Sequence, residues 1–167
     1  EFCLRGDDGG VPIIPQAQAV ETIRTTLGDP ARQVVFTGMG LVPNAPNSDL
    51  HAAVFRDARG SEYYVALAAD KLVEVTAPND GRPLASGSVP EPDLRRQAEA
   101  LVTRGLPSFP DLMPRLDDVS GAKGDSFFYR WEAGDCMAWT AMPPLAQVGM
   151  TSSGEVVSYI NTLFYCQ

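Results

Sequence analysis

The stretch SFFYRWEAGD at residues 126–135 holds the residues best suited to do chemistry. Arg130, Glu132 and Asp135 combine a cation with two carboxylates, a set that serves general acid–base catalysis when a desolvated pocket shifts the pKa values. On a regular strand, however, Arg130 and Glu132 are neighbours on one face, and such pairs more often form a solvated ion pair. We therefore expect a wet sheet face or the rim of a protein-binding surface, and no catalytic residue.

His51 is the only histidine in the chain, so any Ser/His/Asp or Cys/His catalytic arrangement must include it. Its surroundings, DLHAAVF, contain no nucleophile elbow of the G-x-S-x-G type. A hydrolase built from Glu132, Asp135 and His51 is therefore the least favoured function. Because HExxH, phosphate-loop and calcium-loop motifs are also absent from the sequence, we expect neither a metal nor a cofactor.

Length and charge narrow the class of protein further. A chain of 167 residues is long for one small domain and short for two, which indicates one compact body made of two similar halves. The net charge of −8 argues against nucleic-acid binding, which needs a basic surface to release counterions. No apolar run approaches the ~20 residues that a membrane-spanning helix requires.

Three cysteines, Cys3, Cys136 and Cys166, lie far apart and form no CxxC motif, which disfavours zinc. We favour a disulfide between Cys136 and Cys166 over one between Cys3 and Cys166, with three free thiols as the remaining alternative. Only Lys71 and Lys123 are lysines, and the start at Glu1 is typical of a chain from which a signal peptide has been removed. We expect an extracytoplasmic protein that is secreted, periplasmic or at the cell surface.

Apolar residues at three- and four-residue steps predict one helix in PQAQAVETIRTTLGD and another in PDLRRQAEALVTRGL. Runs of strand-forming residues follow each helix. After the first helix they occupy 33–42, 50–57, 62–69 and 71–76, and after the second 113–120, 126–132, 136–142, 146–150 and 155–164. The GMG at 38–40 is typical of a bulge within a strand.

The order of these elements predicts the domain organisation. Residues 1–12 are expected to form a flexible N-terminal segment, 13–77 a first α+β repeat, 78–90 a linker rich in proline, and 91–167 a second α+β repeat. The predicted fold class is α+β, with two helix-plus-antiparallel-sheet (α-β-β-β) repeats packed into one compact body, because each helix can cover only one face of its sheet.

The segments FRDARGSEYYVAL, FFYRWE and QVGMTSSGEVVSYI, each strand-like and two of them with a tight turn, resemble the PepSY-type domains. The resemblance covers most of residues 13–165, and CMAWTAMPPLAQ departs from it. PepSY-type domains occur as tandem repeats in exported bacterial proteins and in the propeptides of thermolysin-like metallopeptidases. The resemblance implies a non-catalytic α+β module that inhibits or restrains a peptidase, or that senses at the envelope, and it carries no catalytic residue.

Two functional hypotheses follow. In the first, a protein partner, with a secreted peptidase as one candidate, docks on an exposed sheet face or edge strand. Its surface would include Tyr64, Arg130 and Glu132, because alternation places one of two adjacent tyrosines on the outer face. In the alternative, a small apolar ligand occupies a cavity between helix and sheet lined by Trp131, Trp139 and Met150, although aromatic residues on alternate strand positions more often form a packing face.

Overall fold

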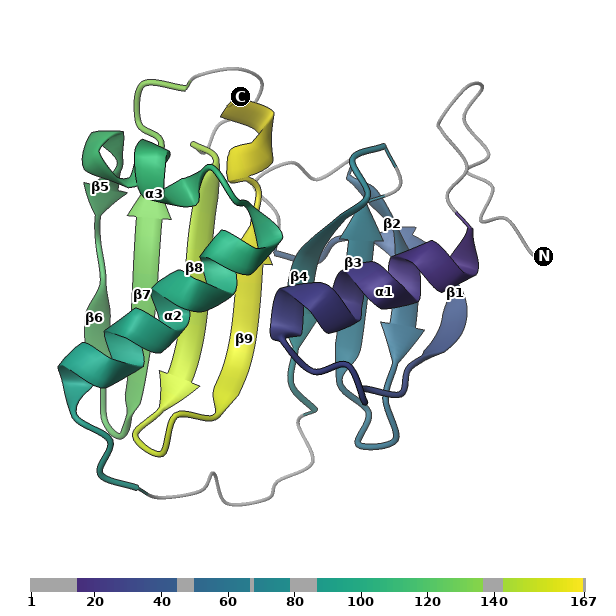
Figure 1. The fold of residues 1–167 in the computed structure, drawn as a ribbon, viewed down its shortest axis with the longest axis horizontal. Coiled ribbons are helices and arrows are strands. Elements are labelled where there is room, and N and C mark those ends of the chain that lie inside the picture. Colours follow the sequence, from purple (N-terminus) through teal and green to yellow (C-terminus); the bar gives the residue numbers. More distant parts are fainter. Residues whose placement is uncertain (1–14, 45–49, 67, 79–86, 137–142, 167) are drawn as a thin grey trace.

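The computed structural model describes residues 15–44, 50–66, 68–78, 87–136 and 143–166 (Figure 1). In chain order, the elements within these ranges are α1 (Gln16–Leu27), β1 (Val35–Leu41), β2 (His51–Arg56), β3 (Glu62–Ala66), β4 (Lys71–Thr76), α2 (Glu91–Gly105), α3 (Phe109–Leu112), η1 (Met113–Arg115), β5 (Asp117–Asp118), β6 (Gly121–Lys123), β7 (Ser126–Glu132), β8 (Leu145–Thr151), β9 (Val156–Asn161) and η2 (Leu163–Cys166). The two η elements are short 3-10 helices.

The strands of the described residues form one antiparallel sheet, and α1 and α2 cross the same face of it (Figure 1). The strand order is β1-β2-β3-β4-β9-β8-β7-β5, and β6 pairs with β7. The predicted α+β class is therefore confirmed. Each half carries more strands than the predicted α-β-β-β unit, because β1 to β4 all follow α1 and five short or long strands follow α2.

Helix α1 has the extent that its apolar spacing predicts. Pro15 precedes its first residue, and Gly28 ends it with φ 68°, a left-handed conformation that costs glycine little. Ala19 and Ile23 lie on its buried face, so the periodic positions are the ones that pack on the sheet.

Helix α2 ends where a glycine lets it approach the sheet closely. Gly105 is the last residue of the helix. A Cβ atom at this position would lie 2.5 Å from the hydroxyl oxygen of Tyr159 on β9 and 3.1 Å from Cγ2 of Thr26 on α1. Only a residue without a side chain fits where the two helices meet the centre of the sheet.

The two halves of the sheet join through β4 and β9, the last strand of each half. Their register pairs Glu74 with Ile160 and Val75 with Tyr159. The strands run in chain order from each edge towards this junction, and each helix lies over strands of its own half (Figure 1). The two halves therefore share one continuous sheet and one main core.

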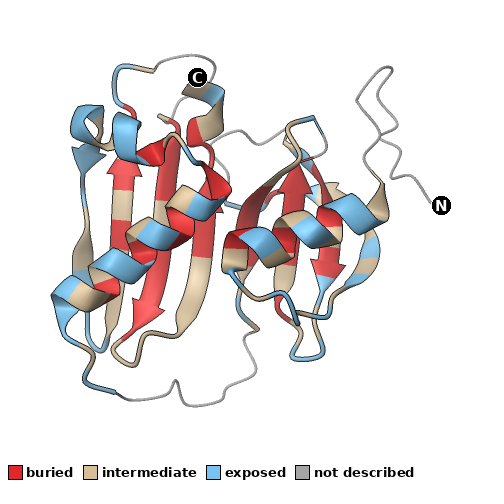
Figure 2. Cartoon of the chain, viewed as in Figure 1, coloured by how far each residue is buried: buried red, intermediate tan, exposed pale blue. Residues whose placement is uncertain are grey.

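The core lies between the helices and the sheet, where buried residues line the central strands (Figure 2). Alternation along β7 places Tyr129 and Trp131 in this core, as the sequence pattern predicts. The ring of Phe109 on α3 meets the ring of Trp131 edge-on, with centroids 5.1 Å apart. The predicted packing face of aromatic residues is thus present in β7, and Trp139 lies outside the described residues.

The opposite face of the first half is also covered. Val42, Ala52, Tyr64 and Val73 form a second buried cluster there. Residues 42–44 lie over this face, where the backbone N–H and the side-chain amide of Asn44 donate to the carboxylate of Glu74 at 3.0 and 2.5 Å. Tyr64 faces outward from the helices but is only 6% exposed, so the prediction that it belongs to a partner surface is wrong.

Several shorter elements differ from the sequence prediction. The predicted strand at 113–120 is instead the 3-10 helix η1 followed by the two-residue β5. Helix α3 and strand β6 were not predicted. The bulge expected at 38–40 lies directly before Gly38, since the register between β1 and β2 shifts between Phe36 and Gly38. Most of the predicted strand at 136–142 lies outside the described residues.

Candidate functional site

The charged pair on β7 is an ion pair on the face of the sheet that the helices leave open. Nε of Arg130 lies 2.5 Å from Oε1 of Glu132, and Nη1 of Arg130 donates to Oε1 of Gln147 on β8 at 3.3 Å. Asp135 lies exposed in the turn beyond β7. The expected ion pair is confirmed, and the two charged groups are hydrogen-bonded to each other on the open face.

The structure does not bring His51 to these carboxylates. His51 begins β2, Glu132 ends β7, and four strands lie between β2 and β7. Five strand spacings of about 4.8 Å separate them by about 24 Å. Within the described residues no three His, Cys, Asp or Glu side chains are placed to share a metal ion.

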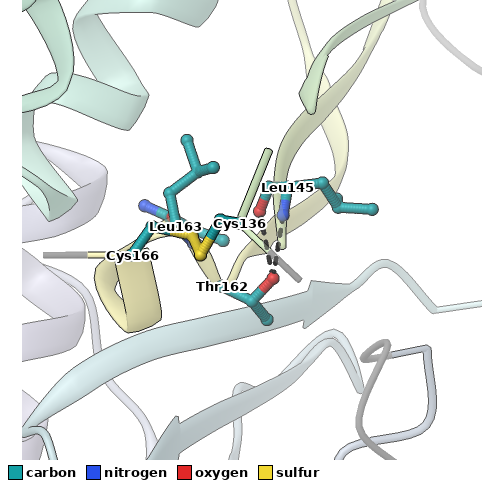
Figure 3. The surroundings of a disulfide bond; sticks show 6 residues. Cys136, Leu145, Thr162, Leu163 and Cys166 are labelled. Atoms are coloured by element: carbon teal, nitrogen blue, oxygen red, sulfur yellow. Dashed lines mark hydrogen bonds between the residues drawn. A yellow bond between two sulfur atoms is a disulfide. The ribbon is translucent and has the colours of Figure 1, made fainter. Parts of the chain in front are cut away.

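Cys136 and Cys166 form a disulfide, the pairing favoured from the sequence (Figure 3). The bond joins η2 to the turn that follows β7. Thr162 fixes the same region, because its hydroxyl accepts from the backbone N–H of Leu145 at 3.0 Å and its own backbone N–H donates to the carbonyl of Leu145 at 2.8 Å. The end of β9 is therefore held both covalently and by hydrogen bonds.

Strand β1 is one edge of the sheet formed by the described residues, and apolar side chains project from it into solvent. Val35 is 70% exposed, Leu41 52% and Met39 39%. The sequence VFTGMGL contains no charged residue and no proline, two of the means by which natural edge strands discourage pairing. The bulge leaves Gly38–Leu41 as a regular edge.

The opposite edge has the protected character that β1 lacks. Its strands β5 and β6 are two and three residues long. They carry Asp117, Asp118 and Lys123, and Asp118 forms an ion pair with Arg95 of α2. Short length and charge both discourage strand addition, so β1 is the edge that is suited to pair with another chain.

A cleft of about 420 Å³ lies where the two halves meet. Its apolar walls include Val75, Leu101, Met150 and Val156. Arg32, Arg59, Arg104 and the hydroxyl of Tyr63 supply polar groups. The volume lies within the range of small-molecule sites in proteins.

Hydrogen bonds to Asp57 organise one wall of this cleft. The hydroxyl of Tyr63 donates to Oδ2 of Asp57 at 2.6 Å, and Nη1 of Arg32 lies 3.1 Å from the same hydroxyl. Burial, followed by the hydrogen bond to Asp57, raises the pKa of Tyr63 to about 12, although the charge of Arg32 opposes the change. Tyr63 is therefore a neutral hydrogen-bonding group at any physiological pH.

The cavity proposed for the apolar-ligand alternative is not the cleft that the structure contains. Trp131 is buried against Phe109 and does not line the cleft, whereas Met150 does. The prediction is therefore wrong for Trp131, because its ring fills the space between α3 and the sheet. Trp139 lies outside the described residues.

Sequence reasoning missed both the exposed side chains of β1 and the arginines of the cleft. The alternation in VFTGMGL predicts a strand but does not tell an edge from a centre, since that depends on which strands pair. The arginines come from a loop, a hairpin turn and a helix that are distant in sequence. The one signal of these arginines in the sequence was the excess of arginine over lysine, because proteins favour guanidinium groups where an anion is bound.

No family model and no curated protein matches this sequence. Among solved structures, the fold is similar to the Bacillus megaterium YpeB C-terminal domain, with a TM-score of 0.59 and 12% sequence identity. The match covers 90% of this chain and 64% of that one, so this chain spans about two thirds of the domain that it resembles. At this identity the similarity concerns the fold. None of the described helices combines the length and apolar character needed to cross a membrane.

Proposed function

We propose that this protein is a non-catalytic, extracytoplasmic binding module that pairs β1 with an extended segment of a protein partner. The observation that carries the proposal is the exposure of Val35, Met39 and Leu41 on an uncharged edge strand. An added strand would bond to the outward N–H and C=O groups of Gly38–Leu41. Its alternate side chains would cover Met39 and Leu41, which share the face of Ala53 on the neighbouring strand.

Location outside the cytoplasm is supported by the Cys136–Cys166 disulfide. Such bonds form and persist in oxidising compartments and are rare in the cytosol.

The partner proposed first is a secreted metallopeptidase. The PepSY-type resemblance implies this class, since such domains occur in the propeptides of thermolysin-like peptidases. An edge strand is suited to the task because a peptidase holds its substrate extended, and the two chains can share backbone hydrogen bonds.

Selection from a random peptide display library tests the edge without assuming a partner. We expect it to enrich peptides with alternating apolar residues, and binding should fall at least tenfold in the double variant Met39→Lys, Leu41→Lys. Val119→Lys is the matched control for the single variant Met39→Lys, because the two residues are 45% and 39% exposed and each variant adds one positive charge. Failure to enrich any peptide, or equal binding to the edge variant, would refute strand addition at β1.

A direct assay tests the peptidase assignment separately. The protein is titrated into a thermolysin-like peptidase, and both binding and residual activity are measured. Binding that depends on Met39 and Leu41 supports the assignment, with inhibition as the regulatory result. Without binding, the peptidase is the wrong partner, while the peptide selection still decides whether β1 is a docking edge.

A further inference from the structure

We propose that the cleft between the halves binds a small organic carboxylate with an apolar body. None of the residues that line it belongs to β1, so this site is distinct from the docking edge and can be tested without a protein partner. Three features carry the inference: an apolar wall, guanidinium groups in the lining, and a cation with no carboxylate partner among the described residues.

The apolar wall comes from both halves of the sheet and from α2. Val75 of β4, Met150 of β8 and Val156 of β9 meet Leu101 of α2 there. A ligand that buries a short hydrocarbon chain against them gains about 25 cal/mol for each Å² of apolar surface removed from water. Inorganic anions cannot use this wall.

Arg104 supplies the cation without a carboxylate partner. Its Nε donates to the carbonyl of Thr26 at 2.9 Å and its Nη2 to the carbonyl of Leu27 at 3.4 Å, so it caps the last turn of α1. Among the described residues no carboxylate lies within ion-pair distance of it. A guanidinium has five N–H donors, and these two bonds leave donors for a ligand.

Arg59 and Arg32 add two further guanidinium groups. Arg59 projects from the β2–β3 turn and lies 3.5 Å from Oε1 of Glu155 in the β8–β9 turn. Arg32 binds Asp29 at 3.0 Å and Asp57 at 3.4 Å. Arg32 is thus fixed by two carboxylates, whereas the exposed Arg59 has one distant partner and is free to exchange it for a ligand.

Three arginines and three carboxylates at the cleft sum to zero, but they are not paired one to one, so one cation is open to an anionic ligand. The lining contains three arginines against the single carboxylate of Glu155, and the carboxylates of Asp29 and Asp57 are bound to Arg32. Arg104 is the arginine of the three that pairs with no carboxylate of the described residues. Burial raises the pKa of Tyr159, and the hydrogen bond with Asn161 and then the charge of Arg104 oppose this shift.

Carboxylate is the anion that fits this arrangement best. A planar guanidinium can bind both oxygens of a carboxylate, with the apolar chain of the ligand directed to Met150 and Val156. Free organic acids and the C-terminus of an apolar peptide share this chemistry, so the experiment includes one of each.

Chemical-shift titration of the ¹⁵N-labelled protein is the test, with hexanoate as the free acid and acetyl-leucyl-leucine as the peptide terminus. We expect either ligand to shift the amides of Ser61, Gln97 and Gly154, with a Kd on the order of 1 mM. The tighter of the two identifies the source. Hexanol and inorganic phosphate, which each lack one half of the chemistry, should bind at least tenfold more weakly.

Arg59→Met is the informative variant, since Arg59 is exposed and its loss leaves the fold intact. It should weaken hexanoate at least threefold, whereas Arg56→Met should not change binding. Arg56 is similarly exposed and also paired with a glutamate, Glu62, but it lies outside the cleft. The proposal is overturned if the cleft amides do not shift, if phosphate or hexanol binds as tightly as hexanoate, or if the two variants behave alike.

Discussion

At the scale of single residues, the carboxylate of Asp57 holds the β2–β3 turn and the hydroxyl of Tyr63 in place. Its Oδ1 accepts from the backbone N–H of Arg59 at 2.9 Å and of Ser61 at 3.0 Å, which closes the β2–β3 turn. Its Oδ2 accepts from the hydroxyl of Tyr63 at 2.6 Å. Burial raises the pKa of Asp57, but these hydrogen bonds together lower it by more, so the net pKa is below the usual value.

We expect Asp57→Asn to lower the free energy of unfolding at neutral pH by about 1 to 3 kcal/mol. Since the folded pKa of Asp57 is below its unfolded value of 3.8, its ionised form stabilises the protein above that pH, and this contribution is lost as pH falls through the folded pKa. The difference between wild type and variant should therefore shrink on acidification. Urea unfolding at pH 7 and near pH 3 measures it, and a constant difference would contradict the account.

At the scale of elements, the junction of α1, α2 and β9 depends on Gly105. An added Cβ would meet the Tyr159 hydroxyl, which also accepts from the amide of Asn161 at 3.1 Å. Alanine favours a helix by about 1 kcal/mol over glycine, whereas overpacking costs about 1 to 3 kcal/mol. The second effect should win because the hydroxyl is fully enclosed.

Gly105→Ala should therefore destabilise the protein by about 1 to 2 kcal/mol, against the direction of helix propensity. Tyr159→Phe removes the oxygen that the new methyl group would contact, so Gly105→Ala should cost less in that background. Thermal unfolding of the two single variants and the double variant measures this coupling. Additive effects would show that the hydroxyl is not what limits the approach of α2.

The disulfide stabilises η2 and the end of β9. A bridge between cysteines 30 residues apart stabilises by about 3.7 kcal/mol in the chain-entropy account. We expect the double variant Cys136→Ser, Cys166→Ser to lower Tm by about 10 °C.

Reductant serves as the control for the cysteine variant. It should lower the Tm of the wild type to that of the variant and leave the variant unchanged. Peptide mapping without reductant should recover the Cys136–Cys166 link, and a link from Cys3 to Cys166 would contradict the structure.

At the scale of the whole molecule, local patterns predicted most elements but not how distant elements meet. The spacing of Ala19 and Ile23 predicts α1, and the alternation of Tyr129 and Trp131 predicts the buried face of β7, because each depends only on neighbours along the chain. The Cys136–Cys166 pairing was favoured from the estimated strand register. These features follow from the period of the sequence.

The cleft, the covered face above Tyr64 and the exposed edge could not be predicted in this way. They depend on the pairing of β4 with β9 and on the hydrogen bonds from Asn44 to Glu74, which join residues far apart in sequence. Strand alternation correctly placed Tyr64 opposite the helices, but it carries no information on what covers that face. We propose that the two halves are repeats of one unit, since both have strands in chain order from edge to centre.

The central claim is that β1 accepts a strand from another chain. Amide hydrogen exchange tests it most directly, with the protein free and bound to a peptide enriched by display. The account predicts new protection of the outward amides of Gly38–Leu41, while those of β5 and β6 exchange as before. Protection at the β5 and β6 edge, or around Arg130 and Glu132 with β1 unchanged, would contradict it.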